Sequence, residues 1–228
     1  MLLLIAIQRF VLPAVVMSLL LAGASSVDVV ADEGLPIAAQ QYVQISVVGK
    51  VDAAAGTVTS IGKPGFVDAR FAVDFSRSPH LRDEFVRLDG RTVEIRGSYI
   101  RCTENAVART PRCDPKRSST GLFLQPVSVK EFRKANGKVS DKDHTVTCVC
   151  RGRLSTGILA LGGETTGYIV DVTNAGSVTW ELDLDKRERS RADLLDGRAV
   201  LVSGDLVVRK GVAVADRWMV RVRTLATN

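Results

Sequence analysis

The sequence contains few of the residues that carry most enzyme chemistry. Its 228 residues include two His, four Cys, three Tyr, two Trp and seven Phe. The motifs of serine hydrolases (G-x-S-x-G), zinc proteases (H-E-x-x-H) and phosphate-binding loops do not occur. His80 and His144 also have no partner residues at the spacing of a metal site or a catalytic triad. These absences favour a protein that is not an enzyme and that holds no cofactor.

The sequence also lacks a large excess of charge of either sign. Its 31 Lys and Arg residues stand against 25 Asp and Glu residues, which gives a formal charge of +6, and 46% of the residues are hydrophobic. This composition is typical of a globular chain, and it excludes collagen-like, disordered and multi-span membrane proteins. The length allows one or two domains with buried cores.

One long apolar run stands at the N-terminus. Residues 1–26 are apolar around a single basic residue, Arg9, and they end in the small-residue pattern AGASS at 22–26. This pattern predicts a cleaved signal peptide, so we expect an exported protein of the periplasm, the cell surface or the extracellular space, with no transmembrane segment in its mature chain. The alternative is an uncleaved membrane anchor, because about 20 apolar residues can span a bilayer.

Export permits disulfide bonds. Cys102 and Cys113 bracket the polar segment TENAVARTPR. We expect these two cysteines to form a disulfide that closes this segment into a loop. Such a bridge contributes about 2–3 kcal/mol in the chain-entropy account of disulfide stabilisation.

An internal repeat organises the rest of the chain. Four short anchors recur in the same order, which predicts two copies of one domain at 42–132 and 144–226, joined by a polar linker at 133–143. The anchors are VVGKV (47–51) with CRGRL (150–154), LDGR (88–91) with LDGR (195–198), Gly97 with Gly204, and PVSVK (126–130) with MVRVR (219–223).

Each copy shows three strands, a short helix and two more strands. Alternating apolar residues predict the strands, and Ser78-Pro79 and Asp185 predict the helix starts. In the first copy the strands are expected near 43–47, 57–61, 66–75, 91–101 and 122–131, with a helix from 78 to 88. In the second copy they are expected at 145–154, 165–172, 177–184, 198–209 and 213–224, with a helix from Lys186 to Leu195.

The motif L-D-G-R-x-V-x-x-x-G, where the helix leads into the fourth strand, resembles small exported bacterial OB-fold domains. The resemblance implies a mainly β protein of two tandem five-stranded OB-fold-like Greek-key barrels, each with one short helix between strands 3 and 4. The motif specifies a turn and a strand, and it carries no chemistry. Function therefore has to be argued from side chains outside it.

Cys148 and Cys150 lie two residues apart, so they share one face of a strand. They align with Ile45 and Val47 of the first copy, which are apolar, so we expect buried free thiols. Two alternatives stay open. The cysteines could form a bridge, or the two thiolates could hold a soft metal such as Cu(I) or Zn.

Two groups of basic residues are candidates for ligand binding. The first lies in the long loop between the fourth and fifth strands of the first copy, and the second lies on the last strand of the second copy. The alternative is ordinary solvated surface charge. The residues are Arg109, Arg112, Lys116 and Arg117 in the loop, and Arg217, Arg221 and Arg223 on the strand.

The sequence therefore predicts an exported, non-enzymatic binding protein. Its partner is expected to be an anionic polymer of the cell envelope or another protein. Nucleic acid is not expected, because single-strand binding couples a basic groove with aromatic stacking platforms and this chain has few aromatic residues. The alternatives are a structural or self-associating module and a soft-metal-handling protein. The oligomeric state and the identity of the ligand are left open.

Overall fold

The structure is a computed structural model that describes residues 41–101, 122–135, 137–159, 164–172, 178–211 and 216–227. The chain divides into two units, Met1–Gly34 and Leu35–Asn228. All described residues belong to the second unit. Among them, no helix is long and apolar enough to cross a membrane. The predicted signal peptide at 1–26 lies outside the described residues, so it stays a prediction.

The first five strands close into a barrel, here called the first barrel. Around it the order is β1-β2-β3-β5-β4, and β4 pairs again with β1. All neighbours are antiparallel except β3 and β5, which are parallel. The elements are β1 (Tyr42–Asp52), β2 (Thr57–Ser60), β3 (Ala69–Val73), α1 (Leu81–Arg87), β4 (Thr92–Arg101) and β5 (Leu122–Glu131). A five-stranded Greek-key barrel with this architecture is an OB-type barrel.

The next five strands, here called the second barrel, pair in the same order. The ring runs β6-β7-β8-β10-β9 and returns to β6, and β8 and β10 are its parallel pair. The elements are β6 (Thr145–Ser155), β7 (Ile169–Val172), β8 (Val178–Asp183), α3 (Lys186–Asp193), β9 (Ala199–Arg209) and β10 (Arg217–Thr227). The prediction of a mainly β fold with a closed five-stranded barrel is confirmed.

Several element boundaries differ from those expected. β3 is shorter than 66–75 because residues 61–68 leave the sheet as a loop, which is closed by the Gly62 N–H bonded to the Asp68 carboxylate at 2.8 Å. Helix α1 begins at Leu81, and Ser78 does not cap it, because its carbonyl instead accepts the Leu81 N–H in a tighter preceding turn. In α3 the predicted cap is confirmed: the Asp185 carboxylate accepts the Glu188 N–H at 2.8 Å.

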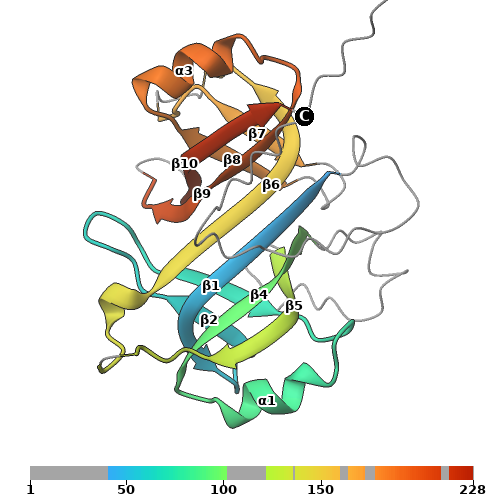
Figure 1. Ribbon diagram of the computed structural model, residues 1–228, viewed down its shortest axis with the longest axis vertical. Coiled ribbons are helices and arrows are strands. Elements are labelled where there is room, and N and C mark those ends of the chain that lie inside the picture. Colours follow the sequence, from blue (N-terminus) through green and yellow to red (C-terminus); the bar gives the residue numbers. More distant parts are fainter. Residues whose placement is uncertain are drawn as a thin grey trace, which may run out of the picture. The chain divides into compact units, whose positions relative to one another are not determined.

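The two barrels are joined through their first strands. β1 and β6 run antiparallel and side by side (Figure 1), and their pairing is centred on Ile45 and Cys148. On either side of this centre, Val43 pairs with Cys150 and Val47 pairs with Val146. Because Ile45 and Cys148 are also aligned positions in the two predicted copies, the pairing is symmetric about the predicted repeat. Each strand thus pairs with backbone N–H and C=O groups of the other that would otherwise form an open sheet edge.

The recurring L-D-G-R motif forms the same clamp in both barrels. Asp89 accepts the Ala53 N–H, and Asp196 accepts the Thr156 N–H, each at 2.8 Å. The glycines that follow have positive φ angles of 69° and 71° at Gly90 and Gly197, a conformation that favours glycine. The motif therefore ties the end of each helix to the turn after the first strand, which is a structural role.

Aromatic side chains connect the two barrels in their shared hydrophobic core. Phe71 of β3 meets Trp218 of β10 with ring centroids 5.4 Å apart, and Tyr99 of β4 stacks on Trp180 of β8 at 5.9 Å. Phe71, Tyr99 and Trp180 are buried, whereas Trp218 is half-buried against the same core. Because each contact joins one barrel to the other, loss of one barrel removes packing from its neighbour.

This shared core predicts that the two barrels unfold together. Phe71→Ala, which removes a buried ring from the first barrel, should lower the free energy of unfolding by about 3–5 kcal/mol. Both tryptophans lie in the second barrel, so their fluorescence reports on that barrel. In denaturant titrations, tryptophan fluorescence and far-UV circular dichroism should therefore show the same loss of unfolding free energy. An unchanged tryptophan transition would show that the barrels are independent. Val86→Ala, at an exposed position, is the control.

Candidate functional site

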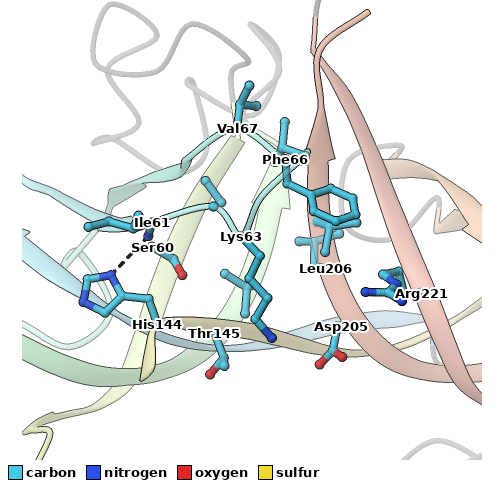
Figure 2. A pocket seen from close by; sticks show the side chains of 15 residues that line it. Ser60, Ile61, Lys63, Phe66, Val67, His144, Thr145, Asp205, Leu206 and Arg221 are labelled. Carbon is cyan, nitrogen blue, oxygen red and sulfur yellow. Dashed lines mark hydrogen bonds between the residues drawn. The ribbon is translucent and has the colours of Figure 1, made fainter. Parts of the chain in front are cut away.

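A small pocket lies where a loop of the first barrel meets the second barrel. Its volume is about 50 Å³, which is room for a few water molecules. Residues come from the loop between β2 and β3, from the start of β6, and from β9 and β10 (Figure 2). The charged, aromatic and titratable side chains that line it include Lys63, Phe66, His144, Asp205 and Arg221.

A turn in the loop between β2 and β3 presents Lys63 and Phe66. The Phe66 N–H donates to the Lys63 carbonyl at 2.9 Å, and Gly65 has φ of 87°. Proline at the second position and glycine at the third are the residues that a type II turn favours. The next residue, Val67, donates its N–H to the Val208 carbonyl of β9 at 2.9 Å, which anchors the loop on the second barrel.

Cations of the second barrel surround Phe66. The guanidinium carbons of Arg209 and Arg221 lie 5.3 and 5.9 Å from the centre of the Phe66 ring, within the range of cation–π attraction. The exposed Lys63 side chain extends toward Thr145 and Asp205 (Figure 2). We call Lys63, Phe66, Arg209 and Arg221 the junction cluster, since it brings three cations together where the barrels meet.

The linker before β6 is tied to the same loop. His144 is only 4% exposed, and its Nδ1 accepts the Ile61 N–H at 3.1 Å. Burial lowers the pKa of His144, and the neighbouring Asp141, Asp143 and Asp68 partly oppose this shift. Since Nδ1 must be unprotonated to accept a hydrogen bond, the structure requires the neutral imidazole.

The end of the linker is folded onto itself. The Asp143 carboxylate accepts a hydrogen bond from the Lys134 ammonium at 2.8 Å and another from the Ser140 N–H at 2.9 Å. These contacts lower the pKa of Asp143 to about 2. The segment just before β6 is thus held in place beside His144.

We predict that acid weakens the structure through His144. An unfolded histidine titrates near pH 6.5, above the folded pKa, so the unfolded state takes up the proton first as the pH falls. The stability contributed by neutral His144 is complete above about pH 6.5 and is lost as the pH falls toward the folded pKa. His144→Gln should flatten the dependence of unfolding free energy on pH in this window.

The matched control for His144 is His80→Gln, because His80 is exposed next to α1. Urea titrations at several pH values measure both variants. An equal pH slope in His144→Gln and the unmodified chain would rule out His144 as the acid-sensitive contact.

The three arginines predicted on the last strand all lie beside carboxylates. Arg217 forms a bidentate pair with Glu181 at 2.5 and 2.9 Å, and both side chains are largely buried. Arg223 bonds to Asp205 at 2.6 Å, whereas Arg221 lies 3.9 Å from Asp183. β10 is therefore not an uncompensated basic strip. Only Arg221 also joins the junction cluster.

The other predicted binding residues, Arg109, Arg112, Lys116 and Arg117, lie outside the described residues, as do Cys102 and Cys113. The basic loop and its disulfide therefore stay predictions.

Cys148 and Cys150 are free and buried among the core residues, as expected. Contact with the Cys150 thiol and burial raise the pKa of Cys148 well above its usual range, which disfavours the thiolate needed for metal binding. Within the described parts of the chain, no group of three or more His, Cys, Asp or Glu side chains could hold a metal ion.

Burial of the two thiols predicts their reactivity. In the folded protein Cys148 and Cys150 should resist alkylation by iodoacetamide, and in denaturant both should react. Mass spectrometry of peptides from native and unfolded samples measures this difference. Rapid labelling of either thiol in the folded protein would contradict their placement in the core.

Comparison with solved structures gives a distant likeness. No family model matches the chain, and no curated protein matches it. Among solved structures, the chain is similar to a deletion mutant of the single-stranded DNA binding protein from Thermus aquaticus, with 10% identity and a TM-score of 0.45. The match covers 83% of this chain and 96% of that chain. The two barrels are assigned from the strand pairings of this chain and not from this likeness.

This comparison corrects one expectation about partners. Nucleic acid was not expected from the sequence, but one solved structure to which the chain is similar is of a single-stranded DNA binding protein. A small number of aromatic residues does not exclude nucleic acid, because charge alone supplies most of the non-specific affinity for a nucleic-acid backbone. The expectation is therefore withdrawn, and nucleic acid belongs among the ligands to test.

Sequence reasoning missed Lys63, Phe66 and Arg209 and gave no role to His144. The segment GKPGF at 62–66 was a signal, because a Pro-Gly turn carrying a lysine and a phenylalanine exposes both side chains. Nothing in the sequence, however, placed this turn next to Arg209.

Proposed function

We propose that this chain is a non-catalytic binding protein, built from a duplicated OB-type barrel, whose junction cluster binds a polyanionic polymer. An anionic polymer of the cell envelope and a single-stranded nucleic acid both have this chemistry. Export through residues 1–26, and further cations in the loop closed by Cys102 and Cys113, belong to the same proposal.

The observation that carries the proposal is the local excess of positive charge at the junction. Neither Lys63 nor Arg209 forms an ion pair with another described residue, and the nearest carboxylate to Arg221 is 3.9 Å away. Asp205 lines the same pocket, but its charge is already balanced by Arg223. Among the described residues, these three cations thus share a single long carboxylate contact, from Asp183 to Arg221, and the remaining positive charge attracts a partner of opposite charge.

Phe66 explains how the cations are arranged. Because Arg209 and Arg221 both lie against its ring, the phenylalanine orients cations toward a ligand. The pocket of about 50 Å³ is too small to enclose a nucleotide or a sugar. These features support a polymer that lies across the surface and is recognised through its charged groups.

Support for a duplicated unit comes from the symmetric β1–β6 pairing and from the equivalent L-D-G-R clamps. Duplication followed by divergence would explain why the two barrels share their core pattern and differ in their charged residues. The junction cluster draws on both barrels, so it exists only where two barrels are joined.

The test measures binding of a fluorescein-labelled single-stranded oligothymidylate by anisotropy across a salt series. The variant Lys63→Ser/Arg209→Ser/Arg221→Ser should bind at least about tenfold more weakly. The slope of log affinity against log salt should also fall by about 2, since each lost phosphate contact removes about 0.7.

The matched control replaces three exposed arginines of the first barrel, Arg77, Arg82 and Arg91, with serine. This control carries the same change in net charge and should retain its affinity. Inorganic polyphosphate is the competitor: displacement of the oligonucleotide shows recognition of charge rather than of bases. Failure of the unmodified chain to bind either polyanion at low salt would contradict the proposal, and so would equal weakening in the control.

A further inference from the structure

The second barrel exposes two leucines, one at the C-terminal end of α3 and one in the connection between β6 and β7. Leu159 is 93% exposed, and Leu194 is 78% exposed. They belong to two segments that are bonded together: the Thr156 N–H donates to Asp196, and the Tyr168 hydroxyl donates to Asp193 at 3.1 Å. Two bulky apolar side chains are thus exposed to solvent on adjoining segments of the same barrel.

The acidic and basic side chains around these leucines differ in their partners. The carboxylates of Asp185, Asp193 and Asp196 are exposed, and each accepts a hydrogen bond within the protein. The donors are the Glu188 N–H, the Tyr168 hydroxyl and the Thr156 N–H, in that order. Glu188 is half-buried, with one carboxylate oxygen fully covered. Four cations of this region are also exposed, and they form no ion pair with a described residue; they are Lys186, Arg187, Arg191 and Arg198.

The first barrel lacks this surface. At the position equivalent to Leu194 it has Arg87, which is paired with Glu84 at 2.6 Å. Its first two strands are joined by a tight turn at 53–56, whereas the second barrel has a longer connection at 156–168 that carries Leu159. Since the shared fold needs neither leucine, their exposure is a property of the second barrel alone.

From these contrasts we infer that Leu159, Leu194 and the cations of α3 form a docking surface for an anionic lipid bilayer. Exposed leucines flanked by Lys and Arg are the side chains that peripheral proteins insert at the boundary of headgroups and acyl chains. The leucines enter the apolar layer, and the cations contact anionic headgroups, each adding modest attraction near the surface. This surface uses no residue of the junction cluster, so it does not depend on the proposed function.

The test is co-sedimentation of the full chain with phosphatidylcholine vesicles, with and without phosphatidylglycerol. We expect more binding to the phosphatidylglycerol vesicles, weakened by salt. Leu159→Ser/Leu194→Ser should lower the partition coefficient by about tenfold or more, because each leucine loses its burial in the membrane. The control is Val86→Ser/Val127→Ser, which removes two exposed apolar side chains from the first barrel and should have no effect.

A second readout reports on the site itself. Tryptophan placed by Leu159→Trp should shift its emission to the blue on adding phosphatidylglycerol vesicles, whereas Val127→Trp should not. All variants keep residues 1–26, so any membrane contact of that segment is common to them. The inference is overturned if Leu159→Trp shows no shift, or if the leucine and valine variants bind vesicles equally. Variant Lys63→Ser/Arg209→Ser/Arg221→Ser should bind vesicles normally, which separates this surface from the junction cluster.

Discussion

The antiparallel pairing of β1 with β6 is the interaction on which the rest of the structure depends. A five-stranded barrel leaves part of its first strand with unpaired N–H and C=O groups, and an open edge of this kind invites pairing with other chains. Here each barrel covers the edge of the other, with Ile45 opposite Cys148 at the centre. The same pairing brings Phe71 and Tyr99 against Trp218 and Trp180, so hydrogen bonding and apolar burial both hold the barrels together.

This arrangement also creates the junction cluster. The loop that carries Lys63 and Phe66 reaches the second barrel only because β1 and β6 are paired, and the Val67–Val208 hydrogen bond then fixes it there. His144 adds a second contact to the loop from the linker. The cations of the cluster therefore have a fixed geometry that depends on both barrels. A neutral His144 supports that geometry, which links the proposed binding surface to pH.

The elements of each barrel could be predicted because their signals are local. Strand alternation and the L-D-G-R motif act over a few residues, and the clamps of Asp89 and Asp196 show why the motif recurs. The junction could not be predicted, because Phe66 and Arg209 meet only through the tertiary fold. The carboxylates beside the arginines of β10 could not be predicted for the same reason: Glu181 and Asp183 on β8, and Asp205 on β9, reach these arginines from neighbouring strands.

Native-state hydrogen exchange of the β1 and β6 amides tests this account most directly. Amides between paired strands exchange only when the pairing opens, and those that open last report the global free energy of unfolding. We predict that the amides of residues 43–48 and 145–151 exchange as slowly as those of the central residues of β4 and β9. Fast exchange along the shared edge, with slow exchange inside each barrel, would show that the barrels are not joined through β1 and β6 and would contradict the account.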